Sequence, residues 1–160
     1  MGFQAGAAVT TGTSNTLVGS NAGDALTTGA DNVAIGNFAL SAEDGHGKNV
    51  AIGRDALLVQ NAGADGYNVA VGYGALYTNT LGSKSTAIGV SALQNQNYTT
   101  ATDSNNTAVG YVAGLSITTG EATLSGSSVE IITPSFFFGS ATNNISSSND
   151  DLSITTKNLI

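Results

Sequence analysis

Short apolar segments alternate with longer polar stretches over residues 1–120 of the chain. Each complete segment places two adjacent aliphatic residues before a Gly, and an Asn, or Ser85 in one copy, lies four residues before that Gly, as in residues 32–36 (Asn-Val-Ala-Ile-Gly). Short runs of β-branched residues between Asn and Gly are typical of strands. We see no segment with the length and 3.6-residue period of an amphipathic helix. The pattern therefore predicts an all-β chain.

The Gly that ends each apolar segment recurs so regularly that it marks a repeat. The intervals between successive marker Gly residues are 17, 17, 17, 19, 17 and 21 residues. An Ala follows every marker by three residues, and Leu or Gly follows that Ala. The markers are Gly2, Gly19, Gly36, Gly53, Gly72, Gly89 and Gly110. The Ala residues are Ala5, Ala22, Ala39, Ala56, Ala75, Ala92 and Ala113.

One repeat is too small to fold alone, because it holds only a few apolar side chains. Stacked repeats share a continuous core, as in solenoid proteins. A unit of 17 residues is too short for the paired-helix repeats, which need roughly 33 or more. We therefore predict a parallel β-roll, or β-solenoid, of about seven coils over residues 1–120. The longer intervals fall in the polar stretches, where surface loops accept insertions.

Both faces of the predicted strand carry apolar residues. The residue before each complete marker is Val or Ile, and the one before that is Ala in five copies and Leu17 in the other. Adjacent strand residues point to opposite faces, so one row fills the coil and the other needs a cover. The small Ala row suits close approach of another backbone, and the simplest cover is a second copy of the chain. The sequence thus predicts an obligate oligomer.

These units resemble the head repeats of trimeric autotransporter adhesins and of related bacteriophage tail fibres. The likeness is carried by residues 32–36, 49–53, 68–72 and 106–110. In that family such units form a left-handed parallel β-roll and three chains pack as a homotrimer. This chain departs from the family in having Ala where the adhesin heads usually have Ser, and in having longer units.

The resemblance implies a structural and adhesive role outside the cell, on a virion appendage or a bacterial cell surface, without catalysis. The implied partners are two further copies of the chain, a cell-surface receptor or glycan, and the remainder of a longer fibre. The loops at 41–48, 58–67, 77–85 and 94–105 are the longest and most varied. We expect them to form the contact surface, although the sequence identifies no individual contact residue.

The pattern changes over residues 121–160. Val129 and Ile131 match Leu152 and Ile154 at an offset of 23 residues, which indicates a second repeat of a different period. Such segments resemble the shaft regions of phage tail proteins. The second copy stops early at Ile160, so we expect a truncated start of a second β-repeat region.

Composition excludes several functions. Charged residues make up 9% of the chain, with four Lys plus Arg and a net charge of −7. A nucleic-acid binder needs many cations to neutralise phosphates, so we expect no nucleic acid. No apolar run approaches the roughly 18 residues of a membrane span, so we expect no membrane insertion. The absence of Cys removes disulfides, thiolate metal sites and Cys nucleophiles.

His46 lies in the most chemically varied stretch, residues 43–48 (Glu-Asp-Gly-His-Gly-Lys). A general base or metal ligand is conceivable there. A lone His without a second His or Cys makes a poor transition-metal site, so we interpret the stretch as a polar loop. Residues 61–66 contain only part of a calcium-loop pattern. We therefore expect neither a metal nor a cofactor. Further acidic residues are scattered over loops and strand edges, at Asp24, Asp31, Asp55, Asp65 and Asp103.

Two other functions compete with adhesion. Glycan-degrading phage tailspikes are also β-solenoids, and glycosidases use two carboxyl groups roughly 5–9 Å apart. Glu43 and Asp44 are adjacent, as are Asp150 and Asp151, so strand geometry would turn each pair apart. We therefore expect no enzyme activity. A purely structural spacer, or a flat ice-binding β-solenoid, is the other class, although the Thr residues occur as adjacent pairs rather than as Thr-x-Thr arrays. The Tyr residues are interpreted as edge packing.

Overall fold

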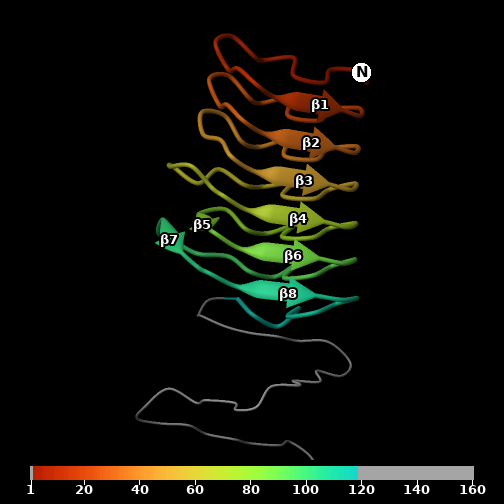
Figure 1. Cartoon of the computed structure of the whole chain (residues 1–160), viewed down its shortest axis with the longest axis vertical. Coiled ribbons are helices and arrows are strands. Elements are labelled where there is room, and N and C mark those ends of the chain that lie inside the picture. The colour runs from red at the N-terminus through yellow and green to blue at the C-terminus, as the bar shows by residue number, and fades with distance from the viewer. Residues whose placement is uncertain (1, 119–160) are drawn as a thin grey trace, which may run out of the picture. The chain divides into compact units, whose positions relative to one another are not determined.

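The structure, a computed structural model, describes residues 2–118. Residues 121–160, where a second β-repeat was predicted, lie outside this range. Within 2–118 no residue is helical, and the chain winds into stacked parallel coils. The predicted all-β solenoid is therefore confirmed for the described repeats (Figure 1).

Six three-residue strands form one parallel sheet, in the order β1-β2-β3-β4-β6-β8. Each strand pairs with its counterpart one repeat along, so that Ala34 lies opposite Ala51 and Ala51 opposite Ala70. The pairing follows the repeat even where the interval between markers is longer than 17 residues. The strands are β1 (Thr16–Val18), β2 (Val33–Ile35), β3 (Val50–Ile52), β4 (Val69–Val71), β6 (Thr86–Ile88) and β8 (Thr107–Val109).

The expected number of about seven coils is corrected to six strands in the main sheet. The strand of each repeat precedes its marker Gly, and in this sequence only Met1 precedes the first marker, Gly2. The turn after Gly2 is nevertheless present and stacks on the next one, with the amide of Gly6 bonded to the carbonyl of Ala22 at 2.9 Å.

The Ala row of the strands lies inside the coil. Ala34 is fully buried, whereas its neighbour Ile35 is 37% exposed. The two rows do point to opposite faces, as predicted, but the assignment of the small row to the outer face is wrong. The interior is narrow, because two Ala residues per coil and one Leu fill it. This core consists mainly of Ala22, Ala34, Ala39, Leu40, Ala51, Ala56, Leu57, Ala70, Ala75, Leu76, Ala87, Ala92, Leu93 and Ala108.

The marker turns stack through the backbone. The amide of the residue four after a marker bonds to the carbonyl of the Ala three after the next marker, as from Leu40 to Ala56 and from Leu57 to Ala75, both at 3.0 Å. The marker Gly residues that follow strands have φ between 128° and 139°. Such a backbone favours Gly, which explains why Gly recurs at the turn after each strand.

The Asn that precedes each strand forms a buried ladder along the stack. The side-chain oxygen of Asn32 accepts the backbone N–H of Asn49 at 3.0 Å, and that of Asn49 accepts the N–H of Asn68 at 3.1 Å. Ser85 continues the row by donating its N–H to Asn68. These bonds satisfy backbone groups at the point where the chain enters each strand, which explains the recurrence of Asn there.

A second buried column changes in character along the stack. It consists of the residues seven positions after each marker, namely Val9, Leu26, Glu43, Gln60, Asn79, Gln96 and Ile117. Leu26, Glu43, Gln60, Asn79 and Gln96 are fully buried. Asn79 donates to the side-chain oxygen of Gln60 at 2.6 Å, and Gln96 donates to that of Asn79 at 3.2 Å. We call the four polar members of this column, Glu43, Gln60, Asn79 and Gln96, the interior polar column. They make the middle of the coil's core polar.

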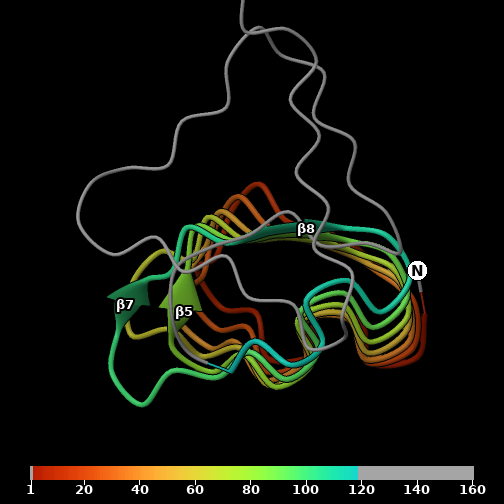
Figure 2. The same ribbon diagram turned by 90° about the horizontal axis from the view of Figure 1, so that it is seen from below.

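The insertions lie in loops on one side of the coil. There β5 (Gly82–Ser83) and β7 (Thr102–Asp103) pair in parallel as a separate two-stranded sheet. Figure 2, which looks along the stack, shows the strands of the main sheet superimposed along one side of the coil and β5 and β7 together at one corner. The expectation that length variation falls in the polar stretches is confirmed.

Candidate functional site

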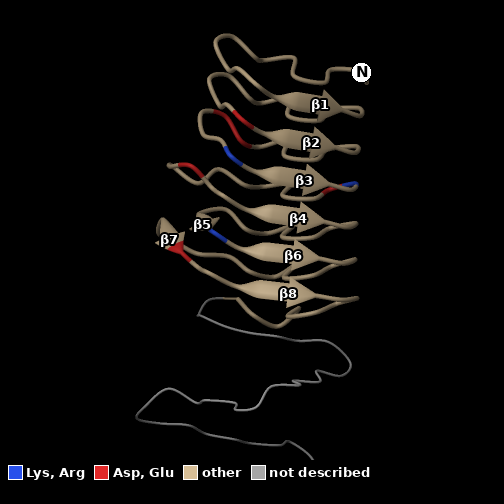
Figure 3. Cartoon of the chain, viewed as in Figure 1, with Lys and Arg blue, Asp and Glu red and all other residues tan. Residues whose placement is uncertain are grey.

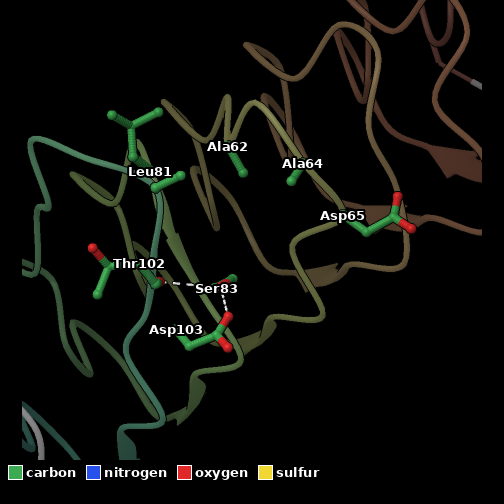
Figure 4. Close-up of a pocket in the computed structure, with 8 residues that line it drawn as sticks. Ala62, Ala64, Asp65, Leu81, Ser83, Thr102 and Asp103 are labelled. Atoms are coloured by element: carbon green, nitrogen blue, oxygen red, sulfur yellow. Dashed lines mark hydrogen bonds between the residues drawn. The ribbon is translucent and has the colours of Figure 1, made fainter.

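The longer loops surround a surface cavity of about 500 Å3. Its walls come from three successive coils, within the predicted contact loops 58–67, 77–85 and 94–105. The Ser83 hydroxyl donates to the carbonyl of Thr102 at 3.1 Å and to a carboxylate oxygen of Asp103 at 2.9 Å. Figure 4 shows these two bonds and, on the far wall, the carboxylate of Asp65 beyond Ala62 and Ala64.

Both carboxylates of this cavity are paired with lysines of the preceding coil. Lys48 bonds to Asp65 and Lys84 bonds to Asp103. Each lysine holds the pKa of its partner carboxyl below the usual range, and Ser83 adds to the effect on Asp103. A general acid needs a raised pKa, and neither group has one. The cavity wall therefore presents a hydroxyl and two carboxylates whose charges are paired with lysines.

Lys48 is also held by an aromatic side chain. Its ammonium bonds to the hydroxyl of Tyr67 at 3.1 Å and lies 5.1 Å from the ring centre. Tyr67 is 50% exposed, and Lys48 links it to Asp65 in the wall of the cavity. The other exposed tyrosines, Tyr73 and Tyr111, lie directly after marker Gly residues, away from these loops.

A second cluster lies in the loop at 41–48. Glu43 belongs to the interior polar column, and one of its oxygens accepts the backbone N–H of His46 at 3.0 Å. The imidazole Nδ1 of His46 is 3.4 Å from the same oxygen. Burial raises the pKa of the Glu43 carboxyl, against the opposing effect of the His46 amide. Ligand atoms of Glu43, Asp44 and His46 all lie within 4.8 Å of one another.

The remaining acidic candidates that the structure describes are not gathered into a site. Asp55 pairs with the adjacent Arg54 at 3.2 Å, and Asp24 accepts a bond from Asn21 at 3.0 Å. Glu43 is buried and Asp44 exposed, as expected for neighbouring residues. Asp150 and Asp151 lie outside the described residues.

The outer face of the main sheet is the third candidate surface. It carries two columns of side chains, one at the first and one at the third residue of each strand. The third-residue column is aliphatic throughout, with exposures of 45% at Val18, 37% at Ile35, 36% at Ile52, 40% at Ile88 and 57% at Val109. The six strands contain no charged residue, and Figure 3 shows the charges in the loops beside them.

Sequence reasoning identified the loops and the strands but missed the interior polar column. This column occupies the seventh position after each marker Gly. The position does not stand out in the sequence, because six different residue types occupy it in seven repeats. The outer Ile and Val column was seen as a row but placed on the wrong side of the strand.

Searches with this chain find no matching family model, no matching curated protein and no matching solved structure. Among the described residues, no helix is long and apolar enough to cross a membrane.

Proposed function

We propose that this chain is a non-enzymatic, structural and adhesive segment of a homotrimeric fibre that attaches a virion or a bacterium to a host or cell surface. The observation that carries the proposal is the uncovered apolar face of the main sheet. The likeness of the repeat to trimeric adhesin heads and phage tail fibres suggests the number of chains and the location outside the cell.

A parallel sheet is normally covered on both faces, and contiguous exposed apolar patches of this kind mark interaction sites. Here the inner face packs on Ala and Leu, while the outer face presents Ile35, Ile52 and their equivalents to solvent. A second copy offers the same columns at the same strand spacing of about 4.8 Å, so the side chains of two copies can interdigitate along the stack. The absence of charge from these six strands leaves no unpaired ion to bury.

Adhesion is assigned to the loops at the corner that holds β5 and β7. The cavity around Ser83, with Asp65 and Asp103 in its walls, combines hydroxyls, carboxylates and small apolar residues, which suit hydrogen bonding to a glycan or a polar protein surface. Trimerisation presents three copies of this surface, and the resulting avidity strengthens a weak single contact.

The assembly is tested by measuring the mass of the full chain by sedimentation and native mass spectrometry. We expect three subunits for the parent chain. The variant Ile52→Lys buries a charge in the proposed interface and should abolish the trimer, and circular dichroism then shows whether the released monomer keeps its strands. Asn95→Lys, an exposed loop position, is the matched control and should remain trimeric. A monomeric parent chain, or an Ile52→Lys trimer, would contradict the proposal.

Attachment is tested separately on the trimer. The exposed residues of loops 58–67, 77–85 and 94–105 are replaced by other polar residues while buried ones such as Gln60, Asn79 and Gln96 are kept, and binding of the labelled protein to cells of the natural host is measured. We expect binding to fall at least tenfold. Unchanged binding by a correctly assembled variant would make this segment a structural spacer, which is the alternative function.

An ice-binding role finds less support on the outer face. Its first-residue column mixes Thr, at Thr16, Thr86 and Thr107, with Val in the other strands. No described strand of the main sheet carries a Thr-x-Thr pair, which is the array that such a role would favour.

A further inference from the structure

We propose that Glu43, Asp44 and His46 form a binding site for a divalent transition-metal cation of the Zn2+ type. The site links the interior polar column to the loop at 41–48. It is independent of the trimeric assembly proposed above, because all three side chains come from one turn of one chain.

The first support is geometric. One potential ligand atom from each of the three residues lies within 4.8 Å of the others, so a single ion can reach all three after small side-chain adjustments. The turn is already closed by the bond from the His46 amide to the Glu43 carboxylate. The imidazole Nδ1 faces that same carboxylate oxygen at 3.4 Å.

The second support concerns polar atoms of the same residues. Glu43 is fully buried, and its Oε2 atom has no hydrogen bond of ordinary geometry, although the backbone amide of Ala62 is near enough to lower the pKa of the carboxyl. The buried Nδ1 atom of His46 has no hydrogen bond either and lies only in ion-pair contact with the other oxygen of Glu43. Buried charges in proteins are paired or coordinate metals. A cation between this interior carboxylate oxygen and the neighbouring imidazole nitrogen would satisfy both atoms at once.

The donor set indicates the class of ion. The lone His is a poor transition-metal site by sequence alone, but the fold brings two carboxylates to it. Imidazole and carboxylate groups are ligands of Zn2+ and its first-row neighbours, whereas Ca2+ and Mg2+ prefer all-oxygen sites. Three protein ligands leave further coordination positions for water. The nearby Asp65 is not counted as a ligand, because Lys48 and the amide of Gly47 occupy its oxygens.

The side chain of Lys48 does not occupy the proposed metal site. Lys48 follows His46 by two residues, but its ammonium is held by Asp65 and Tyr67 of the next coil. Among the described residues, Lys48 therefore does not compete with an ion for Glu43 and Asp44. Occupation would fix the loop at 41–48 to the core of the coil.

The chain contains a single His, which makes the test specific. Full-length protein is treated with chelator, and Zn2+ is titrated at neutral pH while the imidazole resonances of His46 are followed by NMR and the heat by calorimetry. We expect one Zn2+ per chain and a shift of the His46 resonances that saturates at the same stoichiometry. The variants Glu43→Gln and His46→Asn should each weaken binding at least tenfold, while the control Asp55→Asn should bind like the parent.

Three results would overturn the proposal. The first is no change at His46 up to millimolar Zn2+, which would leave only an ion pair between His46 and Glu43. The second is binding that Glu43→Gln retains while His46→Asn loses it, since that describes an exposed imidazole binding metal alone. The third is equal loss in the Asp55→Asn control. Circular dichroism checks that each variant is folded, and Gln at position 43 matches the amides of Gln60 and Gln96 in the same column.

Discussion

At the scale of single residues, the marker glycines meet two demands at once. Gly53 has φ of +132°, and a Cβ atom placed on it would lie 2.5 Å from the carbonyl oxygen of Gly72 in the next coil. Backbone conformation and inter-coil contact therefore both exclude a side chain. Gly63 meets only the first demand, because its φ is +68° but a Cβ atom there would have no neighbour within 4 Å.

The comparison of these two glycines yields the first prediction. Gly53→Ala should lower the free energy of unfolding by about 3 kcal/mol, because it combines left-handed strain with a clash against backbone. Gly63→Ala should lower the free energy of unfolding by only about 1 kcal/mol, because it adds backbone strain without a clash. Thermal and denaturant unfolding at fixed protein concentration measure both. Equal losses would mean that the coils separate easily to admit a methyl group.

At Leu17, a larger side chain on the strand is matched by smaller residues on the neighbouring turns. It replaces the inward Ala of the other strands, and the turns on either side have Gly where four other coils have a buried Leu. Cβ atoms at Gly6 and Gly23 would lie 2.7 and 2.8 Å from the methyl groups of Leu17. One Leu on the strand therefore fills the space that a Leu on the turn fills elsewhere.

A double-mutant cycle tests this exchange. Leu17→Ala should cost about 2 kcal/mol through the cavity it leaves, and Gly23→Leu should destabilise the fold by overpacking. The double variant restores the arrangement of the later coils, so it should recover more than half of the Leu17→Ala loss. Simple additivity of the two unfolding free energies would refute the pairing.

At the scale of elements, the strand positions, their parallel order and the coil architecture could be predicted from the repeat itself. Which of the two apolar rows points into the coil could not be predicted. Ala34 and Ile35 are both apolar, and a strand of three residues is too short for an alternating pattern to distinguish its inner face from its outer face. The size of the coil decides, since a lumen filled by Leu40 and Ala39 has room for Ala but not for Ile. A charge at Ala70 would therefore unfold the coil, and only outer positions such as Ile52 report on assembly.

The candidate site was predicted in part for a similar reason. Glu43, Asp44 and His46 were recognised as the most varied stretch and interpreted as a polar loop. Sequence distance alone does not reveal that Glu43 turns inward, because the same position is Leu26 one coil earlier and Gln60 one coil later. The fully buried carboxylate is visible only once the coils are stacked.

The buried Glu43 predicts a pH-dependent stability. Burial raises the folded-state pKa of this carboxyl above its ordinary value of 4.5, while His46 and the backbone amide of Ala62 oppose the shift and Asp44 adds to it. A raised carboxyl pKa stabilises the fold at pH values below the unfolded pKa, and that contribution is lost as pH rises through the folded pKa. In chelator, Glu43→Gln should therefore be more stable than the parent at pH 7 and indistinguishable from it near pH 4.

The comparison uses thermal unfolding across the range from about pH 4 to pH 8 on both proteins. Asp65 and Asp103, whose lowered pKa values act in the opposite direction, are present in both and cancel in the difference. A parent chain that is the more stable of the two at pH 7 without metal would show that the protein already satisfies the Glu43 charge.

At the scale of the described repeat region, each coil contacts only its neighbours, so the number of coils should be adjustable. Duplicating residues 72–88, the 17-residue interval from one marker Gly to the residue before the next, adds one turn with an inward Ala, a buried Leu and no buried charge. Because the backbone bonds between coils repeat with the unit, the longer chain should keep its ellipticity per residue and its number of subunits, and should melt no more than a few degrees lower. The control duplicates residues 72–86, so that the extra unit lacks Ala87 and Ile88, the strand residues directly before the marker Gly. Because that unit then has no inward Ala and no complete strand to pair, the variant should lose cooperative unfolding; if it folds as well as the complete duplication, the strand before the marker Gly is not needed to stack a coil.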